Sequence, residues 1–250
     1  MKAIMTKTIK SYFSSSFGYI FIGVFFLLSA INFVPVLIQR LMDVQMSAQN
    51  NIDIQNLFLS MANGAFFLMP LLAIGLWSQE KSKGTDKLLL TSPVSSCSII
   101  TGKYLGALIF SLIPILSTLL IVVLTAFLGK ISILPILFSY IAFILLTSFS
   151  IAIGLFFSSL TDKTENAALG AVGLMIFLGS LEIFKSMPNI PKYISVVTDF
   201  LSVQRNYSEM FTSSALFTAF LNPAPIVYFL SLTALFLFGA SIAVKCKNSK

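Results

Sequence analysis

The chain has 250 residues, of which 57% are hydrophobic and only 10% are charged, and its formal net charge is +7. Uncharged windows recur that are long enough to cross a hydrocarbon core, which needs about 20 helical residues. With no histidine the chain lacks an imidazole for zinc or haem, and its two cysteines fall in different expected loops, so neither a metal centre nor a disulfide is expected. The composition predicts an all-α, polytopic membrane protein.

The first 16 residues predict an amphipathic helix ahead of the first span. Apolar residues such as Met1, Met5 and Ile9 recur at helical spacing, and lysines such as Lys7 and Lys10 occupy the opposite side. This pattern is typical of a helix lying at the cytosolic interface of a membrane, although a plain extension of the first span remains an alternative.

Six apolar runs bounded by charges or prolines follow. The fifth is the weakest, because it contains few residues before Glu182 and must extend to residue 184 or end in a tilted or broken segment. A five-span arrangement remains an alternative. The expected spans are residues 17–38, 57–77, 104–128, 133–160, 167–184 and 224–244. In the second, Trp77 is expected to be an aromatic anchor at the headgroup level. In the third, Pro114 with its neighbouring hydroxyl residues predicts a kink.

The distribution of basic residues predicts the orientation. With a cytosolic N-terminus and six spans, 11 of the 16 basic residues and four of the nine acidic ones lie inside, so the excess positive charge faces the cytosol. The basic balance is therefore a topology signal and needs no nucleic-acid partner. Both termini are expected in the cytosol, and the chain in the inner (cytoplasmic) membrane. Residues 185–223 are expected outside, as short helices at or in the outer leaflet.

Residues 79–103 form a polar, basic loop between the second and third spans, and lipid cannot accommodate such a stretch. Gly84 is expected to end the preceding helix, and Thr85 or Asp86 to cap the next turn. Ser92-Pro93 resets the backbone before Ser95 or Ser96 begins a second short helix. The loop thus predicts two short helices joined by a proline turn, suited to a groove on a soluble protein, or else a solvated loop that only sets topology.

The second cytosolic loop offers no catalytic pair. Asp162 and Glu165 beside Lys163 are interpreted as a helix cap and surface charges rather than as an acid and base. Four of the spans hold no ionisable group that could relay protons, which disfavours a proton-coupled pump. No catalytic residue and no metal ligand is therefore predicted.

Three stretches carry a resemblance to a known family. The run Glu80 to Val94, closed by Gly102-Lys103, resembles the signature cytosolic loop of ABC-2 type transporter permeases, in particular the branch of gliding motility and nitrous-oxide-reductase maturation. Residues 154–161 and 228–238 are similar to the same family. Family members usually carry Glu where this chain has Asp86, a departure that keeps the charge.

The resemblance implies the transmembrane half of an ATP-driven, type-2 exporter, with an interface helix at the N-terminus and a coupling helix in the first cytosolic loop. By this analogy the stretch from Ser92 to Ile100 docks on a separate ABC ATPase subunit. By this analogy a second contact comes from Asp162 and Lys163, and the permease dimerises with an identical or related copy. ATP and Mg would be held by the partner, and no cofactor by this chain. The residues expected to contact the ATPase are Glu80, Lys81, Gly84, Thr85, Asp86, Leu89, Ser92, Pro93, Val94, Ser95, Ile99 and Lys103.

The sequence agrees with a partner that supplies the ATPase. A phosphate-binding G-x-x-x-x-G-K-[ST] loop is missing, since Cys97 stands where its first glycine belongs and Tyr104 where its hydroxyl residue belongs. The alternative function is a non-transport membrane scaffold or assembly component of an ATPase-linked motility or secretion complex. A membrane enzyme ranks third, because no convergent nucleophile, base or metal cluster is visible.

Overall fold

The structure is a computed structural model that describes residues 1–43, 54–82, 84, 95–128, 133–185, 192–212 and 223–248. All of its regular elements within these ranges are α-helices. Six helical segments are long and apolar enough to cross a membrane: Ser16–Pro35, Leu57–Ser82, Ser96–Phe127, Pro135–Leu160, Thr164–Leu181 and Ala224–Cys246. The predicted all-α architecture with six candidate spans is confirmed.

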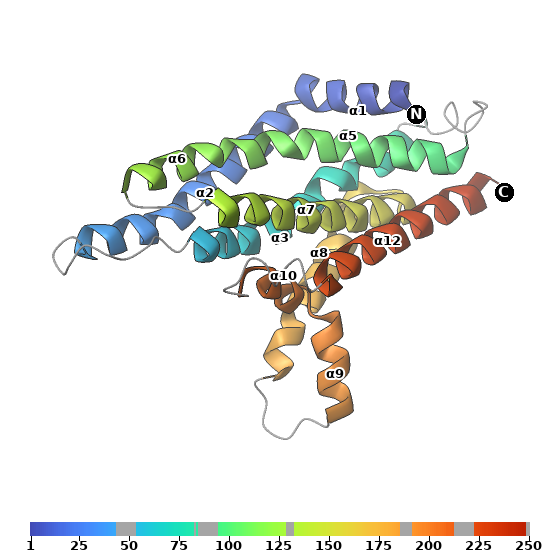
Figure 1. Ribbon diagram of the computed structural model, residues 1–250. Helices are drawn as coiled ribbons and strands as arrows, with labels where there is room; N and C mark the ends of the chain where they lie inside the picture. Colours follow the sequence, from blue (N-terminus) through green and yellow to red (C-terminus); the bar gives the residue numbers. More distant parts are fainter. Residues whose placement is uncertain are drawn as a thin grey trace.

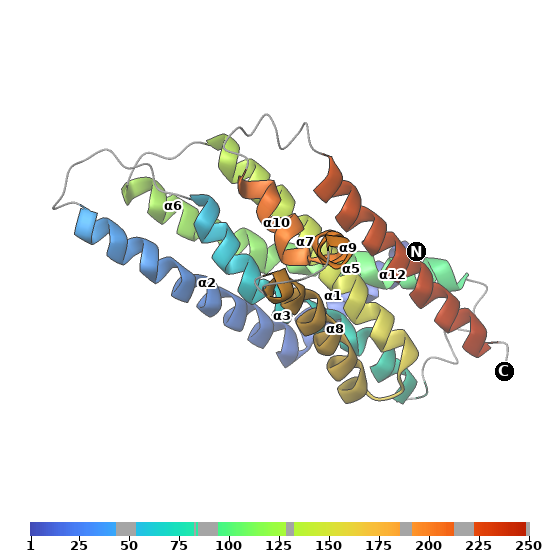
Figure 2. The same ribbon diagram turned by 90° about the horizontal axis from the view of Figure 1, so that it is seen from below.

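The long helices run side by side in a bundle, with α7 (Ile133–Leu160) at its centre (Figures 1 and 2). Helix α3 (Ile54–Ser82) packs along one side of α7, and α12 (Ala224–Asn248) along another. Helix α2 (Ser16–Asp43) covers the outer side of α3. The start of α1 and the end of α12 lie toward the same end of the bundle, as an even number of spans requires.

Close contact between α3 and α7 depends on a glycine. A Cβ atom built on Gly154 would lie 2.2 Å from the carbonyl oxygen of Pro70, so the two backbones meet where no side chain separates them. One turn earlier on α7, Phe149 and Ala152 are fully buried. The stretch 154–161, one of those that resembles the ABC-2 family, therefore forms part of the central helix contact.

The third span begins earlier than predicted and is interrupted within its length, whereas its end at Leu128 agrees with the prediction. Helix α5 begins at Ser96 rather than at Tyr104, and ends at Ser117, after which α6 continues from Leu119 to Leu128. The interruption is a single residue, Thr118, whose backbone stays in the right-handed helical region with φ −67° and ψ −15°, and whose hydroxyl donates to the Ile115 carbonyl at 2.6 Å. The kink expected at Pro114 stays a prediction.

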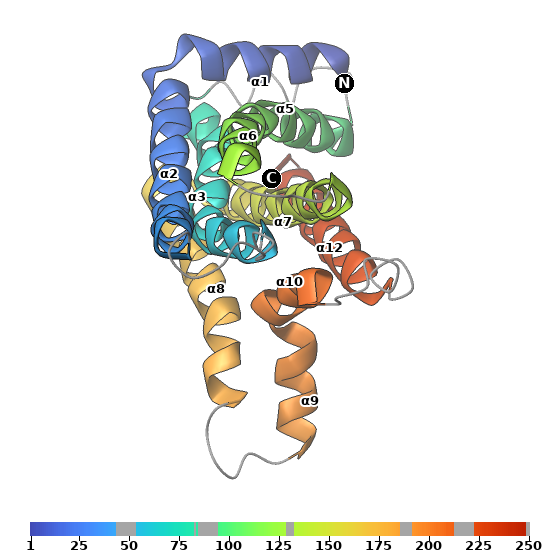
Figure 3. The same cartoon turned by 60° about the vertical axis from the view of Figure 1, so that its left-hand side comes forward.

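The end of the fifth span, α8 (Thr164–Lys185), and the two helices described after it, α9 (Lys192–Leu201) and α10 (Val203–Thr212), form an arm at the side of the bundle (Figure 3). Helix α8 leaves the bundle, α9 lies beside it, and α10 turns back across α7 (Figure 3). The hydroxyl of Tyr228 in α12 donates a hydrogen bond to the Leu201 carbonyl at 2.9 Å, which joins the arm to the bundle. Within the described part of residues 185–223, α9 and α10 are short helices, and their expected place at the outer leaflet stays a prediction.

The apolar surface faces outward, as expected for a protein surrounded by lipid. On α2 the side chains of Tyr19 and Ile20 are 61% and 63% exposed, and on α6 Phe127 is 85% exposed. Such a surface is stable only against hydrocarbon or another apolar partner. Trp77 is an exception to the prediction: it is not an interfacial anchor, because it is 2% exposed and packs inside the bundle.

Candidate functional site

Helix α1 (Lys2–Ser14) is docked along α5 rather than extending α2. The backbone at Ser15 is extended, with φ −102° and ψ 137°, which separates α1 from α2. Ile4 and Thr8 pack directly on Gly102 and Gly106 of α5, where a Cβ on Gly106 would lie 2.7 Å from that of Thr8. Residues 2–14 thus form a helix separate from the first span, and its inner face is built by Ile4, Thr8 and Tyr12. Its place at the cytosolic interface of the membrane stays a prediction.

Tyr12 joins α1 to two helices at once. Its ring stacks on Phe110 of α5 with 4.6 Å between ring centroids, and its hydroxyl donates to the carbonyl oxygen of Leu72 in α3 at 2.6 Å. Burial raises the pKa of the Tyr12 phenol well above its usual value, so the group stays neutral and remains a donor. A buried hydrogen bond of this kind fixes the position of α1 against the bundle.

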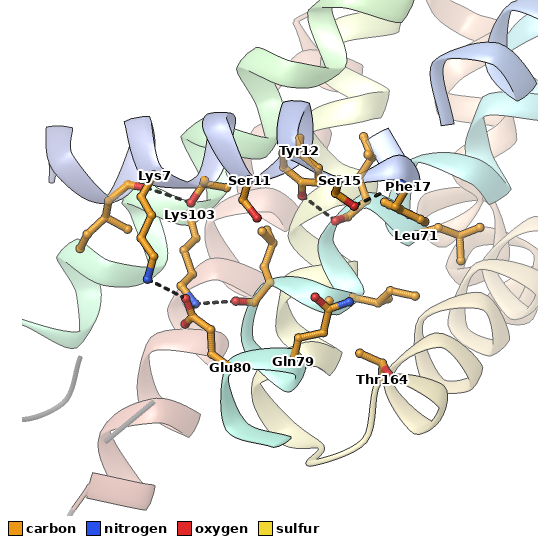
Figure 4. Close-up of a pocket in the computed structure, with 16 residues that line it drawn as sticks. Lys7, Ser11, Tyr12, Ser15, Phe17, Leu71, Gln79, Glu80, Lys103 and Thr164 are labelled. Carbon is orange, nitrogen blue, oxygen red and sulfur yellow. Dashed lines mark hydrogen bonds and ion pairs between the residues drawn. The ribbon is translucent and has the colours of Figure 1, made fainter. Parts of the chain in front are cut away.

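A cluster of charges closes the junction of α1, α3 and α5, and its centre is a buried lysine. Lys103 of α5 is 2% exposed, and its ammonium group donates to the carboxylate of Glu80 and to the carbonyl oxygen of Leu76, both on α3. It also lies 4.5 Å from the centre of the Trp77 ring, a cation–π contact. Lys7 of α1 approaches the other carboxylate oxygen of Glu80 at 3.5 Å. Glu80 is thus held between two cations that come from different helices (Figure 4).

The second expected contact loop is joined to the same end of α3. Lys81 forms an ion pair with Asp162, which lies between α7 and α8. Slightly deeper, the Ser158 hydroxyl of α7 accepts from the backbone N–H groups of Trp77 and Ser78 at 3.0 Å each and donates to the Ile74 carbonyl at 2.6 Å. The last turns of α3 and α7 are therefore tied together by backbone hydrogen bonds as well as by charge.

A cavity of about 390 Å³ lies between α1 and α3. Lys7, Glu80 and Lys103 gather at one end of it, and Phe17 and Leu71 lie at the other (Figure 4). Hydroxyl and amide side chains line the middle, namely those of Thr8, Ser11, Ser15 and Gln79, with Thr164 of α8 at the edge.

The predicted contact residues fall into three groups. Gly84 has a positive φ of 67° and its N–H donates to the Lys81 carbonyl, so it ends α3 as expected, and the Ser95 hydroxyl caps α5 by accepting from the Ser98 N–H. Ile99 is 1% exposed and, like Lys103, faces the interior, whereas Asp162 and Lys163 are exposed. Six of the predicted residues lie outside the described ranges: Thr85, Asp86, Leu89, Ser92, Pro93 and Val94.

One part of the loop prediction is wrong. The second of the two short helices, expected from Ser95 to Ile100, is instead the first turn and a half of α5. Its apolar residues Ile99 and Ile100 are buried in the bundle and so continue the span without a break. A proline turn, if present, would lie in the stretch 85–94, which falls outside the described ranges.

Several residues of the site were missed by reasoning from the sequence: Lys7, Tyr12, Trp77 and Ser158. The sequence contains patterns near some of these residues, but each pattern has more than one interpretation. The spacing Gly102-x-x-x-Gly106 is the pattern that lets two helices approach closely, and it marks the surface on which α1 docks. Ser158 lies inside the stretch 154–161, whose polar members had no evident partner before the helices were placed.

The comparison with family models decides what kind of protein carries this arrangement. A model described as ABC-2 family transporter protein matches residues 15–244, which includes five of the candidate spans and all but the last two residues of the sixth. The chain belongs to the ABC-2 family of transporter proteins. No match was found among the curated proteins.

The ABC-2 match covers part of the junction of α1, α3 and α5. Matched residues include Glu80 and Lys103, whereas α1 lies ahead of the matched range. ABC-2 permeases are multi-pass membrane subunits that are not ATPases themselves and generally work with a separate ABC ATPase. In this ABC-2 protein, α1 docks on the matched helix α3 through Tyr12 and Lys7.

Proposed function

We propose that this chain is the transmembrane permease subunit of an ABC exporter, in which a separate nucleotide-binding subunit hydrolyses ATP and drives substrate across the membrane. The observation that carries the proposal is the family match over residues 15–244 together with six candidate spans. The bonded junction at the base of the segment between α3 and α5 supports it, because a force on that segment would reach the spans directly.

Within this proposal the predicted contact residues divide by role. The stretch from Thr85 to Val94 touches the ATPase, with Leu89 and Pro93 as its apolar docking residues. Ile99 and Lys103, which face the bundle, anchor that stretch to the spans instead of touching the partner. Asp162 and Lys163 form the second contact, which moves with the first because Lys81 pairs with Asp162.

The proposed assembly has two permeases and two ATPases. Both termini and the α3–α5 segment lie on the cytosolic side of the inner membrane, in agreement with the distribution of basic residues. ATP and Mg are held by the ATPase subunits. The second permease is an identical or related copy, since one six-span half is too small to enclose a transport route. The sequence resemblance further favours the branch of gliding motility and nitrous-oxide-reductase maturation.

Co-purification with the ATPase tests the proposal. We expect Leu89→Asp and Pro93→Gly to lose most of the ATPase partner and of ATP-dependent transport, because they remove an apolar contact and a rigid turn. Leu89→Ile, which keeps the apolar side chain, is the matched control and should retain both. Unchanged ATPase retention in Leu89→Asp would overturn the assignment of the docking segment. An ATPase complex that assembles normally and moves no substrate would favour the scaffold alternative.

A further inference from the structure

The cavity between α1 and α3 has the polarity of an amphipathic ligand. Its charged end is formed by Lys7, Glu80 and Lys103, and its apolar end by Phe17 and Leu71 (Figure 4). With about 390 Å³ it falls within the usual range for small-molecule sites. The charged side chains at one end match the polar group of such a ligand, and the apolar side chains at the other end match its hydrocarbon part.

The charged end carries a positive balance. Two lysines face one carboxylate there, and the carboxylate of Glu80 is engaged by both of them. Lys103 is buried and fully committed to α3, whereas the side chain of Lys7 is 67% exposed and its contact with Glu80 is long. Lys7 is therefore the cation that can turn toward a ligand, with the exposed Ser11 hydroxyl one helical turn away on the same side of α1. A phosphate group fits this set of donors.

The apolar end opens toward the lipid-facing surface. Phe17 lines the cavity and is 45% exposed, and Ile20, one turn further along α2, is 63% exposed. An acyl chain leaving the cavity past Phe17 would continue along α2 in contact with hydrocarbon. The exposed lysines of α1, Lys2 and Lys10, add a field that attracts anionic headgroups to this end of the molecule.

We propose that the α1–α3 cavity binds one anionic phospholipid, whose phosphate contacts Lys7 and the Ser11 hydroxyl and whose acyl chain passes Leu71 and Phe17 to the surface of α2. The bound lipid fills the space between α1 and α3 and holds α1 against the bundle. This site needs no ATPase partner, so its failure would leave the proposed transport function standing, and the reverse also holds.

Trp77 provides a local probe for this site. It is the single tryptophan of the chain, it is 2% exposed, and it lies directly under Lys103, which lines the cavity. The full chain is reconstituted in phosphatidylcholine nanodiscs and titrated with phosphatidylglycerol that carries bromine on the first carbons of its acyl chains, next to the headgroup, so that this short-range quencher lies near the charged end of the cavity and Trp77. We expect saturable quenching of Trp77 that brominated phosphatidylcholine does not reproduce, because burial shields Trp77 from the surrounding lipid.

Matched variants separate the site from general surface charge. Lys7→Gln removes the mobile cation and should weaken the apparent affinity for phosphatidylglycerol about fivefold, from roughly 1 kcal/mol per lysine near the membrane surface. Lys10→Gln removes an equally exposed lysine that does not line the cavity, and should bind nearly as well as the natural chain. Ser11→Phe, at an exposed position of α1, should fill the cavity and abolish saturable quenching.

Three results would overturn the proposal. Equal quenching by the two brominated lipids would show that no headgroup is selected. A loss of affinity in Lys10→Gln as large as in Lys7→Gln would show that only surface charge attracts the lipid. Displacement of the brominated lipid by inorganic phosphate at similar concentration would show an anion site without a chain. If Lys7→Gln misfolds, saturable quenching that survives in Ser11→Phe still contradicts the proposal.

Discussion

Two regions of this protein hold charges in networks, and they differ in how far apart those charges are in the sequence. At the α1–α3–α5 junction, Lys7, Glu80 and Lys103 come from three helices. In the α9–α10 arm, Arg205 pairs with Asp199 and, at 2.8 Å, with Glu209, all within a short stretch. The junction network therefore fixes α1, α3 and α5 relative to one another, whereas the ion pairs of Arg205 fix only α9 relative to α10.

The charged side chains of the two networks also differ in how exposed they are. The side chain of Lys103 is 3% exposed, while that of Arg205 is 34% exposed. Removing one partner of a buried pair leaves an uncompensated charge, but exposed pairs contribute little to stability. The following variants test this difference, from the largest expected effect to the smallest.

Glu80→Gln should have the largest effect. It removes the carboxylate that the buried ammonium group of Lys103 contacts, and we expect a loss of about 3 kcal/mol in the free energy of unfolding, the low end for a broken buried pair. Denaturant or thermal unfolding in detergent measures it. Loss of less than about 1 kcal/mol would mean that the junction is no more rigid than the arm.

Gly106→Ala should destabilise the docking of α1 by about 2 kcal/mol. The added methyl group would lie 2.7 Å from the Thr8 Cβ and 3.1 Å from the Met5 carbonyl oxygen, so α1 must move away from α5. Protease sensitivity of α1 and unfolding in detergent report this change. Gly173→Ala is the control, since its Cβ meets nothing within 4 Å and alanine favours a helix. Equal destabilisation by both variants would contradict the role of the α1–α5 contact.

Arg205→Gln should cost about 1 kcal/mol, mostly in the arm, because it removes charge-assisted hydrogen bonds that are partly exposed to solvent. Hydrogen exchange should become faster at residues 199–209 and stay unchanged in α1 and at the end of α3. Faster exchange at both regions would show that the two networks are coupled after all.

Lys7→Gln should have the smallest effect on stability, about 0.5 kcal/mol or less, since Lys7 is largely exposed and its pair with Glu80 is long. Unfolding of this variant beside Glu80→Gln separates the two contacts of Glu80. An effect as large as that of Glu80→Gln would mean that Lys7, rather than Lys103, compensates the carboxylate.

The sequence predicts the spans well because lipid imposes a simple rule on composition: about 20 apolar residues and no unpaired polar backbone. The same rule explains why the sequence prediction places the start of the third span too late. Residues 96–103 include Lys103, so hydropathy assigns them to a loop, yet Glu80 and the Leu76 carbonyl satisfy that lysine inside the bundle and α5 starts at Ser96. Composition does not reveal a partner that is far away in the sequence.

The candidate site was predictable only in its outline. Gly84 and Ser95 act through the local backbone, so the sequence identifies them as the end of one helix and the cap of the next. Trp77 was assigned to the headgroup level because tryptophan favours that position, but its cation–π contact with Lys103 places it in the interior. Tyr12 and Ser158 act on backbone groups of α3, and such contacts have no sequence pattern.

Topology mapping at Cys97 tests the central claim most directly. Cys97 is exposed in the first turn of α5, next to the proposed docking segment, and changing Cys246 to serine leaves it as the single thiol. A membrane-impermeant maleimide should leave Cys97 unlabelled in intact cells and label it after permeabilisation, because the segment must face the cytosol to meet an ATPase. Labelling in intact cells would place the segment outside and contradict the account.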